Sequence, residues 1–433
     1  MNRFSSSWTT MFASVQWLFF IFANIVVVPI SIGLAFGLPQ HEIASILRSS
    51  LIVTGIACML QGRFGHRLPV MEGPSGVMWA LILNLCFSAS ALGLSFTEVG
   101  GGIVTGMMLA GLVTILLAAF NLVSVIQRIF SPMVMSVYLF LLTFQLIFIF
   151  FNGMLVINDS GTLNLPITLF SFGLAAIVAL LKIKGSKSIG NFSILIGMVG
   201  GWIVYSMLFP TDKPLSANMA APFTIFPLGE PNLQYGIIAI TFLGGLVNLS
   251  NTIVSVQAAS KLLNETPSMK QYKHSFLLTG VNAVVAALFG IVAFTPFASS
   301  IGFLESTQIF KRKPFLIGGA LISLLGIIPP LGLMLATLPI SVGNAVLFVA
   351  YLQLMGTSLK SLNGYAFNSI TIHRLAAPLL IGVSLMTLDP ALFAQVPAVI
   401  QPLVSNGFIM GVLISIVLES AIKWPERKQN LSA

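Results

Sequence analysis

Charged residues are scarce in this chain, and their scarcity limits what class of protein it can be. Only 7% of the 433 residues are charged and 57% are hydrophobic, whereas soluble domains carry about 25% charged residues. The apolar runs extend over about twenty residues each, the length that crosses the hydrocarbon core of a bilayer. The first run, 15–37, is too long for the apolar part of a signal peptide, so we expect it to be retained. A water-soluble globule is excluded, and we expect a multi-pass protein of the cell membrane.

Cysteine and histidine are also rare. The two cysteines, Cys58 and Cys86, fall inside apolar runs and are expected to be small buried hydrophobic side chains. The four histidines have no spacing typical of a metal site, so we expect no metal, no cofactor and no disulfide framework. No catalytic dyad stands at a predicted membrane face, which argues against an enzyme.

The basic residues are distributed unevenly. We place most lysines and arginines, including the 311–313 run and both tails, in one set of loops, and most acidic residues in the other. Arg48 and Lys213 are the basic members that we assign to the acidic set. The positive-inside rule then predicts that both termini are cytoplasmic, which requires an even number of crossings. The net charge of +9 does not indicate nucleic-acid binding, because no soluble domain is present to carry it.

The apolar runs predict about fourteen membrane segments. The longest hydrophilic stretch, 210–232, leaves seven segments on either side, and two halves with an odd number of crossings must be inverted relative to each other. Glycine, proline and serine interrupt the third segment of each half, which is the best sequence pointer to a transporter's binding site. The predicted fold is an all-α integral membrane protein with two inverted seven-segment repeats and half-helices in segments three and ten. The expected spans are 15–37, 43–61, 69–86, 98–120, 128–151, 164–182, 189–209, 233–258, 274–292, 296–309, 314–334, 336–358, 373–392 and 402–422.

The first interruption contains Glu72. Two prolines and two glycines, in Pro69-Val-Met-Glu-Gly-Pro-Ser-Gly76, predict an extended piece and then a half-helix that begins near Ser75 and Gly76. A carboxylate at membrane depth costs about 3 kcal/mol or more. Glu72 is therefore a candidate proton-coupling residue. The alternative is a structural ion pair with Arg63 or Arg67 near the membrane surface.

The second interruption, 293–302, has the same pattern of an apolar extended piece with a proline, followed by small polar residues that open a helix. Facing half-helix N-termini would supply free N–H groups to a ligand. The aromatic ring in this stretch could stack on a planar ligand or simply pack in the protein. The candidate binding residues here are Phe297, Ala298, Ser299 and Ser300.

Segment eight carries a third polar feature. Asn248, Asn251 and Thr252 are spaced i, i+3, i+4 and share one helix face. Such side chains in mid-membrane either form hydrogen bonds between helices or bind a ligand edge that offers both donors and acceptors. The sequence leaves both outcomes open.

These residues resemble the nucleobase–cation symporter-2 family, the nucleobase–ascorbate or uracil/xanthine permeases. The resemblance covers most of the chain and depends on the order and spacing of several short motifs. They are Gln16 beside an aromatic residue, Leu-Pro-Val-x-x-Gly-x-Ser at 68–75, Leu-Leu-Asn-Glu-Thr-Pro at 262–267, and Phe289-Gly290 followed by Ile301-Gly302.

The resemblance implies a core domain that moves against a gate domain, a homodimer, and proton or sodium as the coupling ion. Substrate would lie between the two half-helices, beside segment eight. The implied boundaries are 1–122 and 233–335 for the core, 123–210 and 336–422 for the gate, 211–232 for an extracellular loop and 423–433 for a cytoplasmic tail.

The chain departs from the family pattern at its acidic positions. The family usually has a glutamate where Asn248 stands, and a glutamate or glutamine within the aligned pair Ala298-Ser299. It has a histidine or aspartate at Thr252 and an aromatic residue at Gly76. Glu72 would then be the remaining carboxylate that could couple protons. We predict a symporter of a nucleobase, most readily a purine or oxo-purine. The alternative is a small-anion transporter of the same fold, for sulfate or bicarbonate.

Overall fold

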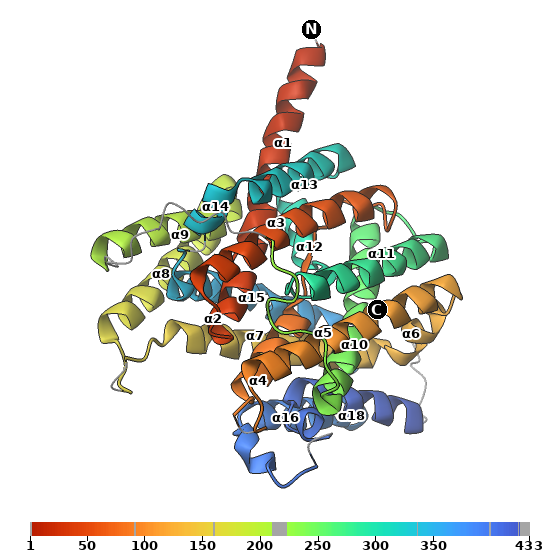
Figure 1. Ribbon diagram of the computed structural model, residues 1–433. Coiled ribbons are helices and arrows are strands. Elements are labelled where there is room, and N and C mark those ends of the chain that lie inside the picture. Colours follow the sequence, from red (N-terminus) through yellow and green to blue (C-terminus); the bar gives the residue numbers. More distant parts are fainter. Residues whose placement is uncertain are drawn as a thin grey trace.

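The computed structural model describes residues 2–90, 92–158, 161–209, 223–335, 337–397, 400–422 and 424. Its elements follow the fourteen predicted segments in order (Figure 1). Segments one to seven are α1 (Asn2–Ile25) with α2 (Val27–Ala35), α3 (Gln40–Arg63), β1 (Glu72–Pro74) with α4 (Gly76–Phe87), α5 (Phe96–Ala119), α7 (Pro132–Met154), α8 (Leu165–Lys184) and α9 (Lys187–Leu208), with the short α6 (Val123–Ile129) before α7.

The second half repeats this order. The predicted loop 211–232 is described only from residue 223, and the predicted tail 423–433 lies outside the described residues except for residue 424. Segments eight to fourteen are α10 (Tyr235–Leu262), α11 (Met269–Leu288), β2 (Phe294–Pro296) with α12 (Ser299–Thr307), α13 (Arg312–Ile327) with α14 (Pro329–Leu335), α15 (Ile340–Ser361), α16 (Ser369–Met386) and α18 (Gly407–Ala421), the last preceded by η1 (Pro390–Phe393) and α17 (Gln401–Val404).

The helices have the length and surface of membrane helices. Among the described residues, eight helices are long and apolar enough to cross a membrane, and shorter apolar helices include α4 and α18. On α8 and α9, large apolar side chains such as Leu169, Ile177 and Met207 are exposed. An exposed apolar helix face is expected against lipid. The predicted all-α membrane fold is confirmed.

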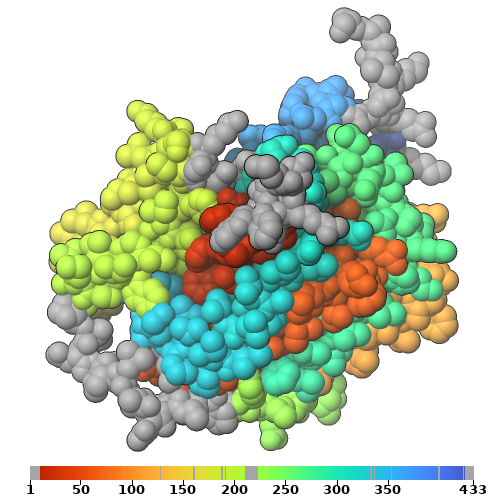
Figure 2. Space-filling view, turned by 90° about the horizontal axis from the view of Figure 1, so that it is seen from above, coloured from red at the N-terminus to blue at the C-terminus, as the bar shows by residue number. Residues whose placement is uncertain are grey.

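Helix contacts fall into two groups. In one, α3 packs on α13, and α11 and α10 pack on α5; in the other, α15 packs on α7, α9 on α8 and α18 on α16. Figure 2 shows α13 lying along α3 on one face of the molecule. Small residues allow helices of the first group to approach closely. On α5, for example, a Cβ built on Gly111 would lie 2.7 Å from the Gly280 carbonyl of α11. The two groups meet through contacts such as α4 with α7 and α10 with α17.

Two three-residue strands lie within the first group. β1 and β2 pair antiparallel, with Glu72 opposite Pro296 and Pro74 opposite Phe294. All six residues are buried. Each strand leads into a half-helix, α4 or α12, as the interruptions in segments three and ten predicted. Antiparallel pairing is the arrangement expected of two inverted halves.

One assignment from the charge pattern was wrong. Arg48 is a residue of α3, not of a loop, and is only 5% exposed. Its Nε donates to the Gly326 carbonyl at 3.1 Å, and its guanidinium lies 4.7 Å from the centre of the Phe223 ring. Carbonyl groups at the end of α13 and an aromatic face compensate the buried cation. Loop charge counts cannot detect such a residue.

Candidate functional site

The two interruptions are held together by backbone hydrogen bonds beyond the strands. The Ser75 N–H donates to the Ala293 carbonyl at 2.9 Å, and the Phe297 N–H donates to the Met71 carbonyl at 2.8 Å. The Ser75 hydroxyl caps α4 by accepting from the Met78 N–H. These backbone groups of the two extended pieces therefore satisfy each other.

Asn248, in the middle of α10, joins both interruptions. The Ser75 hydroxyl donates to its Oδ1 at 2.6 Å, and its Nδ2 donates to the Phe294 carbonyl at 3.1 Å. Asn251 donates to the same Oδ1 at 3.4 Å. The side chain of Asn248 is 3% exposed. Asn248 therefore forms hydrogen bonds with both interruptions, at the place where the sequence predicts a ligand.

A small cavity lies beside Asn248. Its volume is about 10 Å³, room for about one water molecule. A nucleobase can enter this place only if the surrounding helices separate. The walls of the cavity come from α4, α5, α10, α11 and the approach to β2: Met78, Met107, Ala110, Thr114, Gly245, Asn248, Leu249, Thr279, Ala283, Ala293 and Phe294.

The remaining predicted residues of the second interruption have different surroundings. The Phe297 ring is buried close to Gly73, where an added Cβ would lie 3.0 Å from the ring. The Ser300 hydroxyl is buried and accepts from the Met71 N–H at 3.0 Å. Ser299 is exposed and Ala298 is half-buried. Phe297 and Ser300 thus serve packing and strand attachment in this conformation.

Gly76 and Thr252 lie at the edges of the cluster. A Cβ on Gly76 would lie 3.1 Å from the Leu146 side chain of α7, so this glycine is where the half-helix meets the second group of helices. Thr252 is fully buried, and its hydroxyl has no hydrogen-bond partner among the described residues. A buried hydroxyl without a partner is a candidate contact for a ligand.

Tyr138 of α7 faces the cluster from the opposite side. Its hydroxyl lies near Ser250 and Asn251 of α10 but forms no hydrogen bond with the described residues, and its ring lies 5.5 Å from that of Phe408 in a T-shaped arrangement. The residue is fully buried. Sequence reasoning missed Tyr138, because a single tyrosine in an apolar run carries no local signal.

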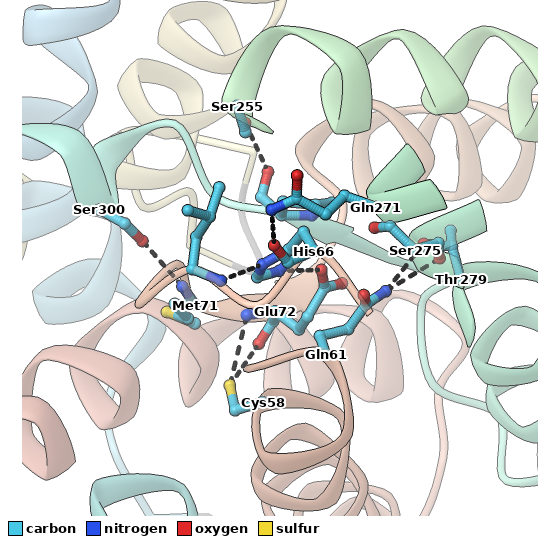
Figure 3. Close-up of polar contacts among 12 residues, drawn as sticks. Cys58, Gln61, His66, Met71, Glu72, Ser255, Gln271, Ser275, Thr279 and Ser300 are labelled. Carbon is cyan, nitrogen blue, oxygen red and sulfur yellow. Dashed lines mark hydrogen bonds and ion pairs between the residues drawn. The ribbon is translucent and has the colours of Figure 1, made fainter. Parts of the chain in front are cut away.

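Glu72 begins β1, which packs against α3, and its side chain contacts a histidine. It is fully buried, whereas Arg63 and Arg67 are exposed. Its Oε1 lies 3.5 Å from Nε2 of His66, which is also fully buried (Figure 3). The Cys58 thiol contacts the backbone N–H and carbonyl of Glu72 at 3.3 and 3.4 Å. The ion pair with an arginine that was considered from the sequence is not formed.

His66, in the connection between α3 and β1, is held by its neighbours. The Leu68 N–H donates to Nδ1 at 3.1 Å, and Gln271 of α11 donates to the His66 carbonyl at 2.9 Å. Burial lowers the pKa of His66 to about 3, so the imidazole is neutral at neutral pH. In the sequence, His66 is one of four histidines without metal-site spacing. Only the packing of α11 over the connection shows that it is buried.

The fold is that of a multi-pass membrane protein, and solved structures share it. The transmembrane domain of the cyanobacterial bicarbonate transporter BicA superposes with a TM-score of 0.63 at 14% identity, covering 94% of this chain and 96% of that one. The structure of SLC26A9 gives a TM-score of 0.65 at 13% identity, covering 95% of this chain and 65% of that one. At such low identity these similarities show the fold alone.

Sequence comparison then identifies the family. The family model Xan_ur_permease, described as "Permease family", matches residues 8–391. The chain belongs to this family of permeases, the nucleobase–cation symporter-2 family, as the sequence motifs indicated. It is a permease and not an enzyme.

Several relatives match over nearly the full length. YwdJ of Bacillus subtilis, a purine permease by designation, is 27% identical over 429 residues, covering 96% of this chain and 97% of that protein. The uric acid transporter UacT of Escherichia coli is 25% identical, covering 96% of this chain and 87% of that protein. The xanthine permease XanP of the same organism is 23% identical, covering 97% of this chain and 93% of that protein.

Proposed function

We propose that this permease carries a purine base of the uric acid or xanthine type across the cell membrane. The observation that supports it most is the position of Asn248, whose amide joins both interruptions at the centre of the fold. An amide offers a donor and an acceptor to the edge of a base. The names of the relatives add the substrate class. The base would replace Ser75 and Phe294 as partners of Asn248.

Transport would follow from movement of the core domain against the gate domain. We keep the predicted core boundaries of 1–122 and 233–335 and gate boundaries of 123–210 and 336–422, which fit the two groups of helix contacts. Tyr138 would close the site from the gate side. The homodimer and the cytoplasmic placement of both termini belong to the same proposal.

Proton coupling through Glu72 is the finer part of the proposal. The positions aligned with the family's acidic residues hold Asn248, Ala298 and Ser299, none of which titrates. Among the described residues, Glu72 is the one fully buried carboxylate. Sodium is the alternative coupling ion, and a test of ion dependence separates the two.

The experiment is uptake by proteoliposomes that contain the purified chain. Labelled xanthine and uric acid should accumulate, and Asn248→Ala should abolish uptake at protein levels equal to wild type. Asn152→Ala on the exposed face of α7, a helix of the second group, is the matched asparagine control and should leave uptake unchanged. Uptake of bicarbonate or sulfate with no uptake of either purine would overturn the proposal in favour of the small-anion alternative.

A further inference from the structure

Behind the strands, on the side of α3 and α11, lies a buried group of polar side chains. Glu72 and His66 are both 0% exposed, and Figure 3 shows the carboxylate pointing toward the imidazole. Among the described residues, neither carboxylate oxygen accepts a hydrogen bond of good geometry. Native proteins satisfy most buried polar atoms, so two unsatisfied oxygens on one carboxylate need an explanation.

The geometry fixes which nitrogen of His66 carries the hydrogen. Because the Leu68 N–H donates to Nδ1, that nitrogen must keep its lone pair. The hydrogen of the neutral ring is therefore on Nε2, which is the nitrogen 3.5 Å from Glu72 Oε1. A second proton on the ring would have to bind at Nδ1, where the resulting N–H would point at the Leu68 N–H. The pair thus has one place for an exchangeable proton, the carboxylate of Glu72.

No cation among the described residues compensates an ionised Glu72. From α3 the titratable neighbour is Cys58, and the part of α1 whose side chains are described, 10–25, and β2 contain no titratable residue. From α11 the neighbouring polar groups Ser275 and Thr279 are uncharged and bind Gln61. The other titratable side chains of α11 lie elsewhere: Tyr272 is directed toward Gln257, Lys270 and His274 are exposed, and Lys273 is half-buried. An unpaired buried carboxylate is costly, and taking up a proton removes that cost.

A route to the surface begins next to the pair. A cavity of about 320 Å³ opens on the face that carries the basic loops, and its wall includes Arg67, Leu68 and Pro69. These three residues are the stretch of chain between His66 and Val70, and Gln271, which holds the His66 carbonyl, lines the same cavity. The pair and this cavity therefore adjoin the same stretch of chain.

The same strand connects the pair to the proposed substrate site. Glu72 begins β1, and Ser75 follows its last residue and donates to Asn248. Glu72 and Ser75 are therefore three residues apart on one extended piece of chain, so a change of charge at Glu72 acts close to the substrate contacts. The partner strand transmits the same change, because Glu72 stands opposite Pro296, whose carbonyl accepts from Ser255 of α10.

We propose that Glu72 and His66 form a single proton site in which Glu72 gains and loses the proton and His66 stays neutral as a positioning residue. The proton exchanges through the cavity beside Arg67 and Gln271. The role of this site in transport rests on the proposed function, but its proton binding does not require a nucleobase.

The test is an infrared pH titration of the purified full-length protein, read at the C=O stretch of a protonated carboxylic acid. Wild type should show one titrating band that Glu72→Gln lacks. His66→Gln should keep the band, because glutamine can accept from Leu68 and donate to Glu72 without titrating. His66→Leu, which removes the donor, should shift the midpoint upward by about one pH unit. His274→Gln on the exposed face of α11 is the matched control and should match wild type.

Three results would overturn the proposal. They are a band that survives Glu72→Gln, a band lost in His66→Gln while the protein remains folded, or a midpoint in His66→Leu equal to that of wild type. Uptake of xanthine at several pH values then connects the site to transport. Glu72→Gln should flatten the pH profile and His66→Gln should preserve it. If the infrared band changes as expected but neither wild type nor any variant transports xanthine or uric acid, the proposed function is wrong and the proton site remains supported.

Discussion

The hydrogen bonds of Asn248 allow one prediction to be worked out from the structure. Asn248→Ala removes the partners of the Ser75 hydroxyl and of the Phe294 carbonyl, both fully buried. A buried polar group left without a partner costs about 1–3 kcal/mol, but hydrogen bonds between membrane helices average only about 0.6 kcal/mol, with a maximum near 1.7. We expect Asn248→Ala to lower the free energy of unfolding by about 2–3 kcal/mol.

A double-mutant cycle isolates the Ser75 contact. Ser75→Ala loses the cap of α4, worth about 1 kcal/mol, as well as the bond to Asn248. In the double variant the Ser75 hydroxyl is no longer present to be left unpaired. The combined loss should therefore be smaller than the sum of the single losses by about 1 kcal/mol. The assay is unfolding by sodium dodecyl sulfate in mixed micelles, with wild type and all three variants in parallel.

Asn251→Ala is the control for this cycle. Asn251 is half-buried and makes one bond of 3.4 Å to Asn248, so its loss should cost less than about 0.5 kcal/mol. Additivity of the Asn248 and Ser75 losses within about 0.3–0.5 kcal/mol would refute the reasoning. So would an Asn251→Ala loss as large as that of Asn248→Ala.

Three further predictions concern packing and charge. Gly55→Ala should destabilise the protein by about 1–3 kcal/mol, because the new Cβ would overlap the backbone of α13. In the control Gly173→Ala on α8, the new Cβ meets no atom within 4 Å, and the change should cost nothing. The measurement is the melting temperature of each variant in detergent. Glu419→Gln should cost about 1–2 kcal/mol, because it removes the charge that now binds the half-buried guanidinium of Arg374 through both carboxylate oxygens, at 2.7 and 2.6 Å. An unchanged melting temperature contradicts this. Gly76→Phe should abolish xanthine uptake, whereas Gly76→Ala should keep most of it. The reason is that Leu146 of α7 lies 3.1 Å from the added Cβ and can move only slightly. Equal uptake by both variants would show that α4 and α7 do not meet during transport.

The sequence was sufficient for the features that are encoded locally. Segment lengths follow from runs of apolar residues, and the interruptions follow from prolines that remove backbone donors, as at Pro74 and Pro296. The i, i+3 spacing also placed Asn248 and Asn251 on one face, and they do contact each other. The roles assigned to the other candidate residues, including Thr252, stay predictions.

The sequence was insufficient where a partner comes from elsewhere in the chain. Nothing near His66 indicates that α11 covers it, or that Arg67 adopts a left-handed φ of 61° and so lets the chain turn between His66 and Glu72. Nothing near Glu419 in the sequence indicates a partner either. Its side chain is 11% exposed and bound to Arg374, a residue of another helix.

Glu72 illustrates the division between the two kinds of information. Its cost at membrane depth was evident from the sequence, because an isolated carboxylate in an apolar run is unfavourable whatever the fold. Its partner was decided by tertiary structure alone. Whether a buried charge has a partner depends on side chains that separate helices bring within about 3–4 Å of it. No local sequence pattern encodes that distance. Composition and chain breaks determined that this protein is a multi-pass membrane protein with a divided centre. The packing of α3, α10 and α11 decided that Asn248 joins the two halves and that Glu72 faces a neutral histidine.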